Sequence, residues 1–152
     1  GTAEAAAIVP AVAEKLARCR GAGDAVFFTR DTHDTRYLQT QEGAMLPVPH
    51  CVKGTPGWEI TAALDVADAT MIDKPSFGSL QLGEAVAALG KPDKITLVGL
   101  CTDICVISNA ILLKAQFPET LICVDAACCA GVTPESHENA LKAMSACQIR
   151  VE

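Results

Sequence analysis

The sequence predicts an α/β fold with a central parallel sheet and helices on both of its faces. Segments typical of buried strands alternate along the chain with segments typical of helices, and this alternation is characteristic of parallel sheets. Half of the residues are hydrophobic but only 4% are aromatic, which leaves Ala, Val, Ile and Leu to build the core. Such a composition suits an α/β protein. A chain of 152 residues is long enough for one domain with a single core.

The individual elements are predicted from periodicity and from end signals. Apolar residues at helical spacing predict the helices, and the first two helices are followed by Gly21 and Gly90. Thr133 and Pro134 are a typical cap and first residue for the last helix. Short apolar runs predict the strands. The predicted helices are 3–19, 80–89, 106–117 and 133–147, and the predicted strands are 25–29, 69–74, 95–100, 120–125 and 148–151.

Charge and cysteine usage exclude several classes of partner. The net charge is −6 with acidic and basic residues interspersed, so nucleic acid and anionic membrane surfaces are not expected partners. No apolar run approaches the roughly 18 residues of a membrane helix, and no leader pattern is present. Several of the eight cysteines lie in or beside predicted strands and helices, in a chain large enough to need no disulfides. We therefore expect reduced thiols and a cytoplasmic location.

Two candidate catalytic residues lie where predicted strands end. Cys105 follows a strand and opens an apolar helix, where backbone N–H groups favour a thiolate and can hold an oxyanion. Lys74 ends another buried strand, and its ammonium would lower the pKa of a nearby thiol. A buried structural cysteine and a lysine reaching solvent are the alternatives. Asp125 ends the next strand and is assigned no chemistry.

Residues 31–58 form a long polar segment that is predicted to be a functional loop. Asp31 and His33 are two residues apart, and Glu42 and His50 lie further along the same segment. Carboxylates and imidazoles suit Zn²⁺, Mn²⁺ or Fe²⁺, although both residue types are also common in turns and caps. His137, on a predicted helix among Glu and Asn, is interpreted as a solvated surface residue.

Several motifs together resemble the isochorismatase-like cysteine hydrolases, and the nicotinamidase branch most of all. They are Asp31-x-His33, the strand-end Lys74 with Phe77 three residues on, and the Gly-Leu-Cys-Thr-Asp-Ile-Cys-Val segment at 99–106. The resemblance covers nearly the whole chain. It implies a three-layer α/β/α sandwich around a parallel sheet, in a single domain over residues 1–152.

The resemblance implies roles for the residues around 99–106. Cys105 matches the nucleophile that attacks an amide carbon and forms a thioester while ammonia leaves. Lys74 matches the lysine of the family's catalytic triad. The family has a cis peptide bond that corresponds to Leu100–Cys101, and the backbone N–H groups of Cys101 and Cys105 form its oxyanion hole.

The resemblance also implies a metal site and a substrate wall. Asp31, His33 and His50 match the metal ligands, and Glu42 occupies the position of a further ligand in some nicotinamidases. Zinc is the metal we expect first, with manganese and iron as alternatives, and in that branch it orients the substrate. Phe77 matches an aromatic side chain beside the substrate ring.

Three features depart from the family pattern. The triad aspartate normally ends an opening, central strand, and neither lies in residues 1–152, so we expect an N-terminally incomplete domain. Pro47 stands where an aromatic residue often precedes the last metal histidine, which weakens the case for a flat pyridine ring. Cys101 takes a place often held by alanine. Trp58 occupies no matching position and is expected to have a packing role.

The leading hypothesis is an amidohydrolase that releases ammonia from a small carboxamide, with nicotinamide first among the substrates. A second hypothesis is another small amide or a ureido substrate. A third is a member that binds a ligand without catalysis, because the general base is absent. Isochorismatase activity itself is less expected, since that branch does not use this metal set. A homo-oligomer is expected by resemblance alone.

Overall fold

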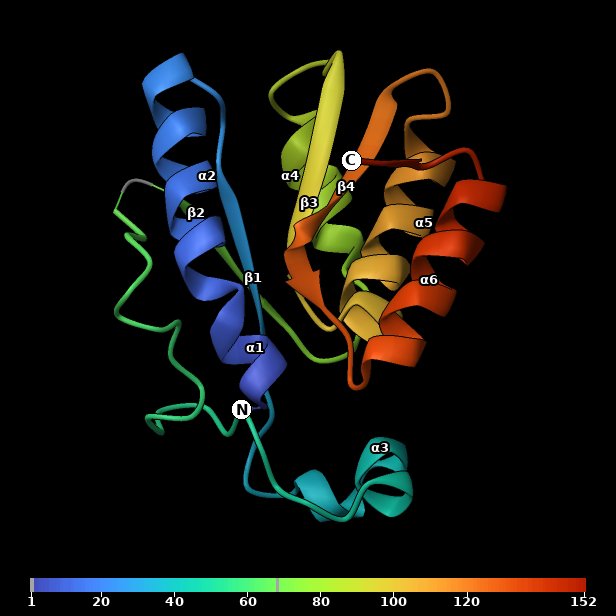
Figure 1. Cartoon of the computed structure of the whole chain (residues 1–152). Helices are drawn as coiled ribbons and strands as arrows, with labels where there is room; N and C mark the ends of the chain where they lie inside the picture. Colours follow the sequence, from blue (N-terminus) through green and yellow to red (C-terminus); the bar gives the residue numbers. More distant parts are fainter. Residues whose placement is uncertain (1, 68) are drawn as a thin grey trace.

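The computed structural model describes residues 2–67 and 69–152, and Figure 1 shows the arrangement of its elements. The helices are α1 (Ala3–Ala7), α2 (Val9–Ala22), α3 (Gln41–Met45), α4 (Leu80–Ala87), α5 (Ile107–Gln116) and α6 (Pro134–Ala146). The strands are β1 (Phe27–Asp31), β2 (Thr70–Lys74), β3 (Lys94–Leu100), β4 (Leu121–Ala130) and β5 (Arg150–Val151). A 3-10 turn, η1 (Tyr37–Gln39), and a π-helical turn, η2 (Thr102–Val106), complete the set.

The described strands form two parallel sheets. One has the order β1-β2 and the other the order β3-β4-β5. In the first sheet the register places Asp31 beside Lys74, at the carboxyl ends of both strands. In the second, Leu100 at the end of β3 lies beside Ala130 at the end of β4. Carboxyl ends of parallel strands are where ligands bind in open α/β sheets.

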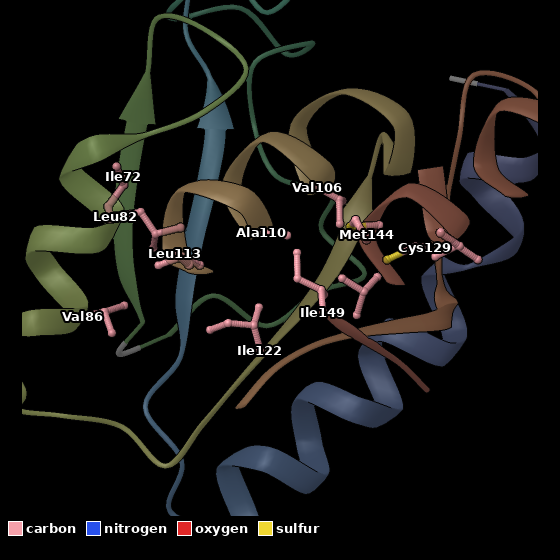
Figure 2. Close-up of a cluster of buried hydrophobic side chains, with 12 residues drawn as sticks. Ile72, Leu82, Val86, Val106, Ala110, Leu113, Ile122, Cys129, Met144 and Ile149 are labelled. Carbon is pink, nitrogen blue, oxygen red and sulfur yellow. The ribbon is translucent and has the colours of Figure 1, made fainter. Parts of the chain in front are cut away.

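Helices cover both faces of the larger sheet, which confirms the predicted α/β sandwich. Side chains alternate between the two faces of a strand. On β4, Ile122 and Val124 belong to the core formed with α4, α5 and α6, whereas the carboxylate of Asp125 pairs with Lys15 of α2. Figure 2 shows the core face, on which Met144 of α6 packs near β4 and is fully buried.

The two sheets are separated by a cavity of about 600 Å³, lined by residues of α2, β1, α4, β3 and α5. Figure 1 shows β1 and β2 on one side of this gap and β3 and β4 on the other. The break thus falls between the sheet β1-β2 and the sheet β3-β4-β5. Cys105 is one of the residues that line the cavity.

Some predicted boundaries were wrong. The single helix predicted over 3–19 is two helices that meet at Ile8, because Pro10 has no N–H to donate to a preceding turn. The second of them ends at Gly23, whose φ of 81° suits glycine. The predicted strand 120–125 extends to Ala130 as β4, with a register shift against β3. The predicted loop 31–58 contains η1, α3 and a β-bridge between His33 and Val52.

Two predictions from composition concern cysteines and membrane helices. All eight cysteines lie within the described residues and are free thiols, as expected. In residues 2–67 and 69–152 no helix has the length and hydrophobicity needed to cross a bilayer.

Candidate functional site

Three charged or nucleophilic side chains meet at the carboxyl ends of β1, β2 and β3. Lys74 is 3% exposed, and its Nζ donates hydrogen bonds to the Cys105 Sγ at 3.3 Å and to the Ser76 carbonyl at 3.1 Å. The same ammonium forms an ion pair with Asp31. The Cys105 Sγ lies 3.8 and 3.9 Å from the two carboxylate oxygens of Asp31. A thiol, an ammonium and a carboxylate therefore share one site.

The turn η2 places the Cys105 thiol. The peptide bond between Leu100 and Cys101 is cis and joins β3 to this turn. The Cys101 carbonyl accepts hydrogen bonds from the backbone N–H groups of Ile104 at 3.1 Å and Val106 at 3.0 Å. The structure thus brings Cys101 and Cys105 into one compact turn at the end of a strand.

The Cys105 thiol is held in its neutral form. Burial raises the pKa of Cys105 to about 11, and the negative charge of Asp31 adds to the increase. Lys74 and the Cys101 backbone act in the opposite direction but do not outweigh them. From the sequence we expected Lys74 to lower the pKa of this thiol, which it does, but burial and Asp31 disfavour the thiolate more strongly. Attack by this sulfur therefore requires a proton acceptor.

A second cluster combines His33, Glu42 and His50. One ligand atom of each lies within 4.8 Å of the others. The Glu42 Oε1 is 3.5 Å from the His33 Nε2 and 3.4 Å from the His50 Nε2. Two imidazoles and a carboxylate are a common ligand set for zinc.

The surroundings of this cluster fit a divalent cation. The His33 Nε2 is buried, and no group within residues 2–67 and 69–152 hydrogen-bonds to it, which is unusual for a polar atom unless it has another ligand. The His50 Nδ1 lies 2.8 Å from the Val48 carbonyl, so Nδ1 carries the proton and Nε2 is free to bind a metal. The Tyr37 ring packs against both imidazoles, with centroids 4.7 and 5.0 Å away.

Asp31 lies outside this cluster. The resemblance assigns it to the metal ligands, but its carboxylate contacts Lys74 and Cys105 instead. The physical reason is the strand register, which places the ammonium of Lys74 directly beside it. The other three expected ligands are brought together.

Phe77 lies in a different environment from Cys105. Its ring is 43% exposed and lines an open hollow with Leu80 and Ile111, whereas Cys105 lines the cavity between the sheets. The role of Phe77 as a substrate wall remains a prediction. Trp58 packs as expected, with the Arg30 guanidinium 3.4 Å from its ring centroid.

Asn109 is a residue of the site that sequence reasoning missed. It is 5% exposed. Its Nδ2 donates to the Phe77 carbonyl at 3.1 Å and to the Cys105 carbonyl at 2.8 Å, and its Oδ1 accepts from the Ser79 N–H at 2.9 Å. It thus joins the turn after Lys74 to the turn that carries Cys105. The available signal was an amide side chain in a largely apolar helix.

The interpretation of His137 as a solvated surface residue was wrong. This side chain is partly buried, and its Nδ1 is hydrogen-bonded to the Thr102 Oγ1 at 2.7 Å. Thr102 opens η2 and comes three residues before Cys105. In the sequence, the polar neighbours of His137 suggested an exposed position, and nothing there indicated the contact with Thr102.

The whole chain matches a known protein family. The isochorismatase domain family matches residues 1–152. A comparison with curated proteins finds no match.

Solved structures similar to this chain carry the same fold. A pyrazinamidase/nicotinamidase from Streptococcus mutans is 26% identical, covers 99% of this chain and 87% of its own, and has a TM-score of 0.86. A pyrazinamidase of Pyrococcus horikoshii in complex with zinc is 24% identical. The match covers 98% of this chain and 86% of the pyrazinamidase, with a TM-score of 0.87. An N-carbamoylsarcosine amidase from Thermoplasma acidophilum is 20% identical. The match covers 100% of this chain and 85% of the amidase, with a TM-score of 0.78. The fold is therefore shared with these structures, and the match of the family model over the whole chain shows that the protein belongs to the isochorismatase family.

Proposed function

We propose that this chain is a cysteine-dependent hydrolase of small carboxamides, with nicotinamide as the first substrate to test. The observation that carries the proposal is the contact of the Cys105 thiol with the Lys74 ammonium at 3.3 Å, beside the Asp31 carboxylate. A nucleophile, a cation and a proton acceptor in contact are the parts that acyl transfer needs. The similar amidases are consistent with this reaction class.

In the proposed reaction the Cys105 sulfur attacks the amide carbon and gives its proton to a carboxylate. The backbone N–H groups of Cys101 and Cys105 hold the oxyanion of the tetrahedral intermediate. The proton passes to the amide nitrogen, ammonia leaves, and a thioester remains for water to hydrolyse. Asp31 is the carboxylate in contact with the thiol.

His33, Glu42 and His50 are the residues that would hold a divalent cation, for which we propose zinc. When bound, such a cation supplies a Lewis acid that can orient a substrate nitrogen or oxygen. The chain itself fixes the two imidazoles, through Val48 and the Tyr37 ring, in positions that leave Nε2 available.

Ammonia release from nicotinamide tests the proposal. We expect turnover by the wild-type protein and a loss of at least about 10³-fold in Cys105→Ala, because no other thiol replaces the nucleophile. Cys147→Ala, which removes an exposed thiol, is the matched control and should retain full activity. Unchanged turnover in Cys105→Ala would contradict the assignment of the nucleophile.

A ureido substrate is the second candidate. Pro47 stands where an aromatic side chain would stack on a pyridine ring, and one similar structure is an N-carbamoylsarcosine amidase. Values of kcat/KM over a panel of nicotinamide, pyrazinamide and N-carbamoyl amino acids separate the two. A chain that hydrolyses none of them, but whose stability rises with one, would favour the non-catalytic alternative.

A further inference from the structure

Two side-chain hydrogen bonds tie the turn η2 to the start of α6. Thr102 and His137 are joined through Oγ1 and Nδ1 at 2.7 Å. The Asp103 Oδ1 accepts a hydrogen bond from the backbone N–H of Val132 at 3.0 Å. The proposed reaction uses neither bond, although both hold the segment that presents Cys105.

Because Thr102 is buried, loss of its hydrogen bond to His137 would be energetically costly. Thr102 is 0% exposed, so its hydroxyl cannot exchange this partner for bulk water. A buried hydroxyl that loses its partner is strongly disfavoured. Removal of the imidazole nitrogen would therefore shift Thr102 and the backbone next to it.

At Gly131 the start of α6 packs closely against the turn η2. A Cβ at this position would lie 2.8 Å from the His137 backbone nitrogen and 3.0 Å from the Asp103 Oδ1. Both approaches are too close for a side chain to be accommodated without movement. The start of α6 and the turn η2 are thus in direct contact, with glycine where the chain passes between them.

Thr102 follows the first residue of the proposed oxyanion hole directly. The carbonyl of that residue, Cys101, accepts the N–H groups of Ile104 and Val106, so the turn is one hydrogen-bonded unit. A rotation at Thr102 would change the directions of the Cys101 and Cys105 N–H groups together.

We propose that His137 is a positioning residue that acts through Thr102 to hold the oxyanion-binding turn. This inference rests on the proposed amide hydrolysis, since it assigns His137 to the step in which negative charge develops on the substrate oxygen. The side chain stabilises the transition state without touching the substrate.

The test compares His137→Leu, which removes the hydrogen-bonding nitrogen, with His137→Asn, which keeps a polar atom near the Nδ1 position. Asn139→Leu, at an exposed position of the same helix, is the matched control. We expect kcat for nicotinamide to fall by about tenfold or more in His137→Leu with KM nearly unchanged, because the oxyanion exists only after attack. His137→Asn should recover most of the loss, and Asn139→Leu should match the wild type.

Thr102→Val provides a second route to the same conclusion. It removes the hydroxyl at nearly constant volume, and its loss in kcat should match that of His137→Leu. The double variant should be no worse than either single one, since both remove one interaction. If His137→Leu does not fold, the comparison of Thr102→Val with Thr102→Ser replaces it.

A ¹³C-labelled pyridine carboxaldehyde gives a readout independent of turnover. Wild-type Cys105 should form a thiohemiacetal, whose oxygen occupies the oxyanion hole, and His137→Leu should bind the aldehyde about tenfold more weakly. Unchanged kcat and aldehyde affinity in His137→Leu, or an equal loss in Asn139→Leu, would overturn the role of His137. A wild-type protein with neither ammonia release nor adduct would instead overturn the proposed function, and the inference with it.

Discussion

Opposite charges act on the thiol of Cys105 from the two neighbouring strands. The Asp31 carboxylate raises its pKa and the Lys74 ammonium lowers it, while burial supplies the largest effect. Sequence spacing suggested the lysine and the cysteine as partners, but it assigned the aspartate to a different cluster. The register of β1 against β2 brings this carboxylate to the thiol.

The two charges should have opposite effects on the reactivity of Cys105. At fixed pH, Asp31→Asn should speed alkylation of Cys105 by iodoacetamide and Lys74→Met should slow it, because only the thiolate reacts. Peptide mass spectrometry with fragmentation distinguishes Cys105 from Cys101. Equal rates in both variants would show that neither charge acts on the sulfur.

Stability should fall as alkaline pH is approached. The native pKa of Cys105 is raised from 9.0 to about 11, so between these values the unfolded chain loses a proton that the native thiol keeps. The free energy of unfolding must then decrease with rising pH across this window. Urea denaturation from pH 8 to 11 should show a shallower decrease in Cys105→Ala than in the wild type, and Cys147→Ala serves as the control.

Measurements of zinc binding distinguish a role of Asp31 as a metal ligand from its role as the ion-pair partner of Lys74. Glu42→Gln and His50→Ala should weaken zinc binding at least about tenfold, because each removes a ligand of the His33 cluster. Asp31→Asn should retain the metal, since its carboxylate contacts Lys74. Zinc content measured by mass spectrometry after dialysis checks this, and loss of zinc from Asp31→Asn would restore the assignment from family resemblance.

Among the elements, α6 has the best-defined start. The Thr133 side chain accepts the Ser136 N–H, and the Ser136 hydroxyl accepts the Thr133 N–H, which together make a capping box. The sequence predicted this start from the threonine and the following proline. The cap also precedes His137 by one turn, so it supports the element that contacts η2.

Loss of this cap should destabilise the protein without removing the site. Thr133→Ala is expected to lower the free energy of unfolding by about 1 kcal/mol, and Thr133→Ser should restore most of it. Urea denaturation followed by circular dichroism measures both. A stability equal to wild type in Thr133→Ala would mean that α6 is held by packing alone.

In the whole molecule, the described strands fall into two sheets that differ in how many partners their strands have. Among the described strands, β1 and β2 have a single partner each, while β4 lies between β3 and β5 and is buried along most of its length. The largest fully buried side chains are concentrated on the β4 side, among them Ile122, Val124 and Met144.

Hydrogen exchange should therefore differ between the sheets. We expect the hydrogen-bonded amides of β1 and β2 to exchange at least about tenfold faster than those of β4, because sub-global opening of a two-stranded unit exposes less core. Exchange followed by mass spectrometry resolves the two regions. Equal protection would indicate that the cavity does not separate two units of different stability.

Residue types and their periodicity were sufficient to predict the α/β class and most of the elements, and they placed Cys105 and Lys74 at the ends of predicted strands. They suffice because the buried face of each helix or strand requires apolar residues at a regular spacing. The end of a strand followed by the start of a helix is also visible in a short stretch of sequence. The motif at 99–106, with Lys74 and His33, added the family.

The partners of Asp31, Asn109 and His137 came from the folded structure alone. The contacts of Asp31 with Lys74 and Cys105 span 43 and 74 positions, and that of Thr102 with His137 spans 35. Such contacts depend on which strand lies beside which, and in what register. No local pattern encodes that choice, because it results from the simultaneous packing of the whole core.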